Sequence, residues 1–127
     1  MNLDIPEYIL DIDSYKPGKP MEELEREYGI SDSIKLASNE NPLGPSPKAI
    51  EAARACLNNV HRYPDGSGWA LVSKIAAQLG LQPDNIVLGN GSDEIIGMLT
   101  RVLLRPGDEV LVPQPTFSMY DIMVRSA

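Results

Sequence analysis

The stretch Ile86–Ile96 constrains the fold of this chain more than any other, and it reads Ile-Val-Leu-Gly-Asn-Gly-Ser-Asp-Glu-Ile-Ile. The short apolar run at 86–88 predicts a strand, and Gly89-Asn90-Gly91 predicts a tight turn. Ser92 is a good helix N-cap, and apolar residues then recur at helical spacing as far as Leu103. The stretch therefore predicts a strand, a glycine turn and a helix in immediate succession.

A strand, a glycine turn and a helix N-terminus in this order can hold an anion. The first backbone N–H groups of a helix have no partner within the helix, and the helix dipole favours negative charge there. Gly91 lets a ligand approach the backbone, and the Ser92 hydroxyl adds a donor. We therefore take Gly91, Ser92 and Asp93 as candidate phosphate-binding residues, although an ordinary strand-to-helix turn explains the same pattern equally well.

Two better-known phosphate motifs are absent. In a G-x-G-x-x-G fingerprint starting at Gly89 the third glycine would fall on Glu94. Gly18-Lys19 is followed by Pro20, whereas a P-loop needs Ser or Thr there. The sequence thus indicates neither a dinucleotide-binding fingerprint nor a P-loop.

The size and charge of the chain exclude several classes of function. Its 127 residues provide for one domain, and its net charge of -7 argues against a nucleic-acid or anionic-membrane partner. No apolar run approaches the roughly 20 residues that span a bilayer, and no secretory signal is recognisable at the N-terminus. The single cysteine, Cys56, cannot form an internal disulfide. We expect a cytoplasmic protein.

Metal and nucleophile chemistry are also not indicated. One histidine and one cysteine are too few for a typical transition-metal site, so no metal is expected. Cys56 and His61 are the only possible Cys–His pair, and no third group is evident to position them. We therefore assign His61 a surface role.

Helical spacing and stop signals predict the remaining elements. Helices are expected at residues 21–28, 47–57, 69–79 and 93–103 and after a Thr116 cap, with strands at 34–37, 86–88 and 109–112 and irregular chain at 1–19. The polar segments Ser38–Pro45 and His61–Gly68 are predicted loops, and loops often carry binding residues.

The order strand, helix, strand over residues 86–112 is a βαβ-type unit and predicts an α/β fold with a parallel sheet. Ligands bind at the carboxyl ends of such strands, so Tyr120 could reach a ligand held at Gly91–Asp93. Only two strands of the sheet are evident, whereas sheets usually hold about five. We therefore expect an incomplete sheet from a larger domain, with an arm and short helix at 1–33 and the large domain at 34–127.

Five motifs follow one another along the chain. They are Leu36–Gly44, Arg62–Asp65, Leu88–Glu94, Pro106–Val110 and Pro113–Tyr120. Together they resemble the fold-type I pyridoxal-phosphate (PLP) aminotransferases, and within that group histidinol-phosphate aminotransferase. Threonine-phosphate decarboxylase and aromatic aminotransferases share much of this pattern and remain alternatives.

The resemblance implies pyridoxal 5'-phosphate as the cofactor and assigns roles toward it. Gly91, Ser92 and Asp93 would bind its phosphate through backbone N–H groups, and Tyr120 would stack on its pyridine ring. Tyr63 would reach the phosphate of the cofactor in the neighbouring subunit, so the resemblance implies a homodimer with a shared active site.

The resemblance also implies a substrate pocket lined by Asn39 and Tyr15, in which an amino group moves between histidinol phosphate and 2-oxoglutarate. The family's Schiff-base lysine would lie beyond Ala127. None of the five lysines present lies in a matching context: Lys16, Lys19, Lys35, Lys48 and Lys74. We therefore expect no catalytic residue in this chain, and we expect it alone neither to transaminate nor to bind PLP tightly.

Two other interpretations stay open at this point. One is a truncated, non-catalytic module that dimerises or docks on a partner through its unpaired sheet. The other is an unrelated phosphate-binding α/β domain, which would prefer nucleotides to pyridoxal compounds.

Overall fold

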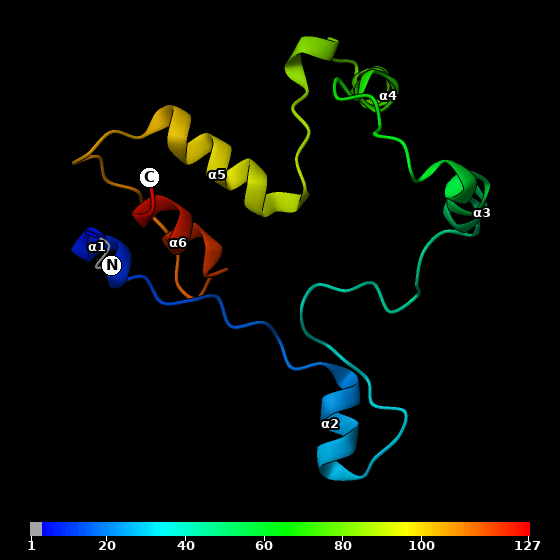
Figure 1. Ribbon diagram of the computed structural model, residues 1–127, viewed down its shortest axis with the longest axis horizontal. Helices are drawn as coiled ribbons and strands as arrows, with labels where there is room; N and C mark the ends of the chain where they lie inside the picture. The colour runs from blue at the N-terminus through cyan, green and yellow to red at the C-terminus, as the bar shows by residue number, and fades with distance from the viewer. Residues whose placement is uncertain (1–3) are drawn as a thin grey trace. The chain divides into compact units, whose positions relative to one another are not determined.

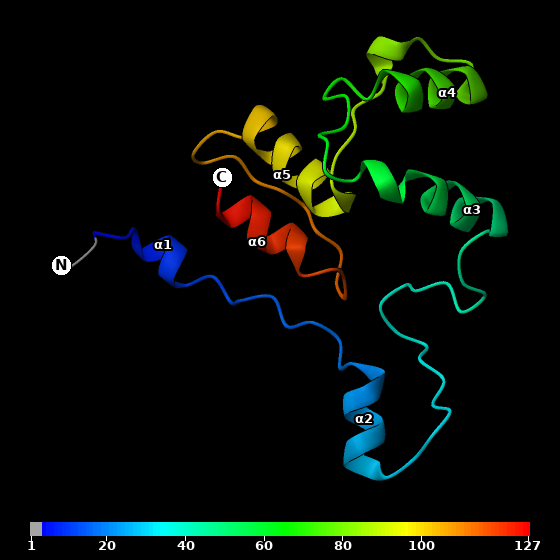
Figure 2. The same cartoon turned by 45° about the vertical axis from the view of Figure 1, so that its right-hand side comes forward.

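The computed structural model describes residues 4–127 and divides the chain into two units, whose elements Figures 1 and 2 show from two directions. One unit contains the N-terminal segment through Tyr15 together with Ser67–Ala127. Its elements are α1 (Glu7–Leu10), α4 (Trp69–Leu79), the 3₁₀ turn η2 (Pro83–Asn85), α5 (Gly91–Leu103) and α6 (Met119–Arg125). The other unit, Lys16–Gly66, contains α2 (Met21–Tyr28), α3 (Pro47–Cys56) and the 3₁₀ turn η1 (Leu57–Asn59).

The ends of α2 and α4 confirm the signals in the sequence. α2 ends at Gly29, whose φ of 63° is left-handed, and α4 runs from Trp69 to Leu79 before Gly80 at φ 67°. Glycine adopts this conformation at little cost because it has no Cβ, so it ends a helix at a defined residue. α3 has Pro47 at its first position after Ser46, as predicted.

Two predicted helix starts are wrong. α5 begins at Gly91 with Asn90 as its N-cap, so Ser92 is the second residue of the helix and not its cap. α6 begins at Met119 after Ser118, and Thr116 does not cap it. In each case a hydrogen-bonded turn that the pattern did not reveal sets where the helix begins.

The N-terminal segment also differs from the expected irregular chain. Residues Glu7–Leu10 form α1, in which the N–H groups of Ile9 and Leu10 donate to the Pro6 carbonyl at 3.0 and 3.3 Å. The helix is only four residues long, too short for helical periodicity to be visible in the sequence.

The predicted sheet is not confirmed, because no strand forms within residues 4–127. The segments 34–37, 86–88 and 109–112 have no regular secondary structure. A strand exists only when its N–H and C=O groups pair with a neighbouring strand, and apolar alternation reports the tendency but not the neighbour. Leu36 and Leu111 lie in these segments with 94% and 99% of their surface exposed.

The closest packing between helices joins α5 and α6, which lie side by side in both views (Figures 1 and 2). Gly97 is buried at this contact, and a Cβ on it would lie 3.3 Å from Met123 Sδ. Thr100 is buried one turn further on, and its hydroxyl donates to the Gly97 carbonyl at 3.1 Å. On α4, which η2 contacts, Ala76 is the one apolar side chain that is buried among the described residues.

Among residues 4–127, no helix combines the length and the apolar character that crossing a lipid bilayer requires.

Candidate functional site

Two backbone hydrogen bonds shape the turn before α5. The Gly91 N–H donates to the Gly89 carbonyl at 2.9 Å, and the Asn90 N–H donates to Glu94 Oε2 at 2.5 Å. Gly91 has a φ of +75°, a left-handed conformation that a side chain would strain. The turn thus engages the amides of residues 90 and 91 and leads directly into the helix.

The next two amides, those of Ser92 and Asp93, are not engaged. Within the described chain neither donates a hydrogen bond, and no side chain caps α5. A Cβ on Gly91 would meet nothing within 4 Å, so the space beside Gly91, at the start of α5, is open. Unengaged amides at a helix N-terminus, with the helix dipole behind them, are an anion-binding arrangement.

The local charge works against a strongly charged anion. Asp93 and Glu94 place two carboxylates in the first turn of α5. These groups interact well with the helix dipole, but they repel a doubly charged phosphate. A tightly bound phosphate therefore needs cationic groups in addition to the amides of Ser92 and Asp93.

Tyr120, from the last motif, and Tyr15, from the N-terminal arm, belong to one aromatic cluster with Phe117. The Phe117 ring lies 5.9 Å from the Tyr15 ring and 6.4 Å from the Tyr120 ring, at interplanar angles of 83° and 88°. Phe117 had no predicted role in the site. Its position three residues before Tyr120, the spacing at which helical side chains meet, was the available signal.

Tyr120 also contacts the surroundings of α5. It lines an apolar pocket of about 220 Å³ between α5 and α6. The other lining residues are Ile96, Leu99, Thr100, Leu103, Leu104, Val110 and Val124. Tyr120 therefore lies against the helix whose first turn carries the unengaged amides.

Asn39 and Tyr63 lie in the other unit. Asn39 has a left-handed φ of 52°, in a loop where Asn41 accepts from the Leu43 N–H and donates to the Gly44 carbonyl, each at 3.1 Å. The Tyr63 side chain is fully exposed. Because the two units are separate bodies, the roles of Asn39 and Tyr63 beside Gly91–Asp93 stay predictions.

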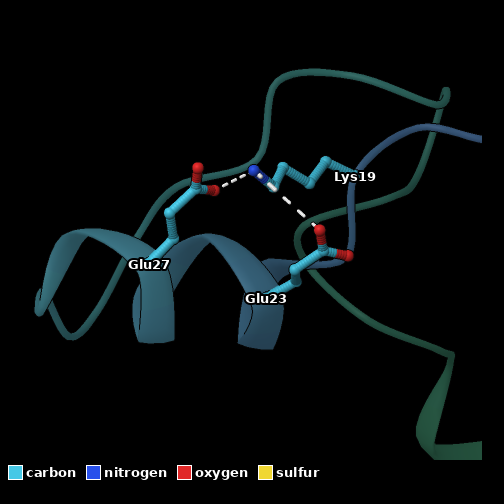
Figure 3. Close-up of polar contacts among 3 residues, drawn as sticks. All are labelled: Lys19, Glu23 and Glu27. Atoms are coloured by element: carbon cyan, nitrogen blue, oxygen red, sulfur yellow. Dashed lines mark hydrogen bonds and ion pairs between the residues drawn. The ribbon is translucent and has the colours of Figure 1, made fainter.

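Lys19 is held by acidic groups of α2 (Figure 3). Its ammonium bonds to Glu27 and lies 3.9 Å from Glu23. The hydrogen bond to Glu27, followed by the charges of Glu27 and Glu23, raises the pKa of Lys19 above its ordinary value of 10.5. A lysine that attacks a carbonyl needs the opposite shift, so Lys19 serves as an ion-pair residue.

In the part of the chain that the structure describes, no group of three or more His, Cys, Asp or Glu side chains is arranged to hold a metal ion.

Comparison with known proteins identifies the family. The family described as "Aminotransferase class I and II" matches residues 31–127. The chain belongs to this family. Three curated proteins named histidinol-phosphate aminotransferase are similar to it over nearly its whole length.

Among these aminotransferases, the protein of Moorella thermoacetica is 51% identical over 115 residues, which are 91% of this chain and 30% of the relative. That of Desulfotalea psychrophila is 52% identical over 125 residues, which are 98% of this chain and 33% of that relative. That of an Anaeromyxobacter species is 49% identical over 118 residues, which are 93% of this chain and 32% of that relative. This member of the family thus spans about a third of the length of the curated aminotransferases it matches.

The turn before α5 fits the phosphate of PLP, the cofactor that the aminotransferase motifs imply. The fit rests on the two unengaged amides of Ser92 and Asp93, the Ser92 hydroxyl and the open space at Gly91. The aromatic ring of Tyr120, 42% exposed beside the same helix, is a suitable surface for a flat heterocycle.

Proposed function

We propose that this chain is the N-terminal part of a PLP-dependent aminotransferase that moves an amino group between histidinol phosphate and 2-oxoglutarate in histidine biosynthesis. The names and the roughly half-identical sequences of the relatives support the substrate. The structural observation that carries the proposal is the pair of unengaged amides at Ser92 and Asp93.

The residues of α5 and α6 bind and orient the cofactor in this proposal. The N–H groups of Ser92 and Asp93 face the phosphate, with the Ser92 hydroxyl as a further donor. The N–H group of Gly91 bonds to the Gly89 carbonyl, so Gly91 contributes the open space beside the phosphate and not a donor. The Tyr120 ring covers one face of the pyridine ring, which fixes its plane and excludes water from that side. PLP itself supplies the electron sink that amino-group transfer requires.

Asn39 and Tyr15 line the substrate pocket, and Tyr63 reaches the cofactor phosphate of the other subunit in a homodimer. The complete exposure of the Tyr63 ring supports this last role, because nothing in its own unit covers it. A side chain that is free in one subunit is available to complete a site in another. We place the enzyme in the cytoplasm.

The remaining groups are supplied by the part of the enzyme that this chain does not span. Asp93 and Glu94 add negative charge at the phosphate, so arginine side chains must balance it. The Schiff-base lysine and the aspartate that pairs with the pyridine nitrogen are also assigned to that part. The 127-residue chain alone is therefore inactive.

The test compares the full-length enzyme with the 127-residue chain. With PLP, the full-length protein should show the near-visible absorbance of a Schiff base, abolished by borohydride, and the short chain should not. Transamination of histidinol phosphate should exceed that of aromatic amino acids, and threonine phosphate should not be decarboxylated. A Schiff base on the short chain, or a preference for another substrate, contradicts the proposal.

The non-catalytic alternatives give different results in the same experiment. A full-length protein that binds no PLP but self-associates would identify a dimerising module. Tighter binding of nucleotides than of pyridoxal phosphate would identify an unrelated phosphate-binding domain.

A further inference from the structure

The Phe117 ring lies between two tyrosines that come from opposite ends of the chain. Its centroid is 5.9 Å from that of Tyr15 and 6.4 Å from that of Tyr120, and both pairs are close to perpendicular. These distances and angles are those of edge-to-face aromatic pairs, which attract beyond the burial of area alone. Phe117 has no polar atom on its side chain, so its ring acts through packing and edge-to-face attraction and forms no hydrogen bond of its own.

Backbone hydrogen bonds hold the two sides of this cluster very differently. On the α6 side, the Tyr120 N–H donates to the Phe117 carbonyl at 3.2 Å, so both residues belong to one hydrogen-bonded turn. On the other side, the backbone N–H groups of residues 13–16 donate no hydrogen bond within the described chain. Among the hydrogen bonds and ring contacts within the described chain, the contact with Phe117 is therefore the one that Tyr15 makes.

We propose that Phe117 is a positioning residue that couples Tyr15, at the substrate pocket, to Tyr120, at the cofactor ring. The inference rests on the proposed function and deepens it, because it assigns a role to a side chain that touches neither ligand. With Phe117 present, a substitution at Tyr15 changes the position of the Tyr120 ring. Without the Phe117 ring, the two tyrosines act independently.

The test is a set of double-mutant cycles in the full-length enzyme. Tyr15→Leu is made alone and together with Phe117→Leu, and the equilibrium dissociation constant for PLP is measured in the absence of substrate. An edge-to-face contact corresponds to a factor of about two to ten. Tyr15→Leu should therefore weaken PLP binding about threefold when Phe117 is present and leave it unchanged in the Phe117→Leu background.

Kinetics and a conservative variant separate positioning from a general structural loss. Phe117→Leu should raise the KM for histidinol phosphate with a smaller change in kcat, and Phe117→Tyr should restore wild-type values because it keeps the ring. Tyr28→Leu is the matched control, since Tyr28 is an exposed tyrosine of α2 outside the cluster. Tyr28→Leu should leave the KM and the kcat for histidinol phosphate unchanged.

A cycle without cofactor keeps the inference testable if the proposed function fails. In the apo-protein, Tyr15→Leu and Tyr120→Leu should couple in the equilibrium constant for unfolding when Phe117 is present and become additive in the Phe117→Leu background. Equal effects of Tyr15→Leu in both backgrounds, in either experiment, overturn the role of Phe117. A protein that binds no PLP but retains the apo coupling overturns the proposed function and leaves Phe117 as the link between the tyrosines.

Discussion

Glu94 accepts a hydrogen bond from the backbone N–H of Asn90, four residues earlier, at 2.5 Å. This bond closes the turn in front of α5 and, together with the bond from the Gly91 N–H to Gly89, engages both amides that precede Ser92. The amides of Ser92 and Asp93 are then the first ones left for a ligand. A side chain in the first turn of the helix thus engages the amide just before the helix.

Replacing Glu94 should loosen this turn. Glu94→Ala leaves the Asn90 N–H without its acceptor and should lower the free energy of unfolding by about 1 kcal/mol. Glu94→Gln keeps an acceptor oxygen and should cost less than half of that. Urea unfolding of the wild type and both variants measures the difference, and equal losses for Ala and Gln would show that the charge and not the hydrogen bond matters.

Replacing the amide of Ser92 tests the anion site directly. Ser92→Pro removes the N–H in the first turn of a helix, where proline is tolerated, whereas Ser92→Ala removes only the hydroxyl. The loss of one hydrogen bond to a charged group is worth about 1.5–3 kcal/mol, so Ser92→Pro should weaken PLP binding by the full-length enzyme at least tenfold. Ser92→Ala should weaken it less. Equal affinities for the Pro variant and the wild type would remove this amide from the site.

Gly68 and Gly80 form a matched pair for substitution by alanine. Both have left-handed backbone, at φ 59° and 67°, but a Cβ on Gly68 would lie 2.5 Å from Leu88 Cδ1, whereas one on Gly80 would meet nothing. Gly80→Ala should cost about 1 kcal/mol for the backbone alone. Gly68→Ala should cost about 1 kcal/mol more, because Leu88 must move. Calorimetry of the two variants decides this, and adding Leu88→Ala should abolish the extra cost.

Gly97 should tolerate substitution by alanine but not by a larger residue. Gly97→Ala gains up to about 1 kcal/mol of helix propensity, which offsets a small shift of the flexible Met123 side chain 3.3 Å away. Gly97→Val adds branched bulk at the contact of α5 with α6 and should cost about 1–3 kcal/mol. Unfolding midpoints compare the two. Unchanged stability of the Val variant would mean that the helices do not pack closely in solution.

The Lys19 ion pairs should be lost at high pH, as Lys19 gives up its proton. The hydrogen bond to Glu27 and the charges of Glu27 and Glu23 raise the pKa of Lys19 above 10.5. While both glutamates are ionised, the pairs therefore stabilise α2 fully below pH 10.5 and lose that effect as the pH rises through the raised pKa. The helicity of residues 21–28, followed by NMR, should fall over that range and with added salt. In a Lys19→Met variant the helicity of residues 21–28 should be lower at neutral pH. It should then depend neither on pH over this range nor on salt.

Local signals in the sequence were sufficient wherever an element is determined by its own residues. α4 begins at Trp69 and ends at Leu79, before Gly80, as predicted. A helix needs only an apolar stripe and a following residue that accepts left-handed backbone. The prediction that Ser92 caps α5 was wrong because another local interaction sets the start of the helix. The competing bond between Glu94 and Asn90 is also local, but the residue types alone do not show which of the two forms.

Features that depend on distant residues were not predictable. The strand segments carry the expected apolar residues, yet a strand needs a partner that a pattern cannot name. The link from Tyr15 through Phe117 to Tyr120 joins residues from the two ends of the chain, so no spacing rule applies to its first half. The family resemblance identified the two tyrosines but not the phenylalanine between them.

The exposure of Leu36 and Leu111, at 94% and 99%, has a practical consequence. Extended apolar segments with open amides are templates onto which other copies of a polypeptide stack. Aggregation that depends on concentration should therefore limit how long this polypeptide stays in solution. Dilute samples that carry a solubilising fusion partner should remain monomeric for longer than concentrated ones.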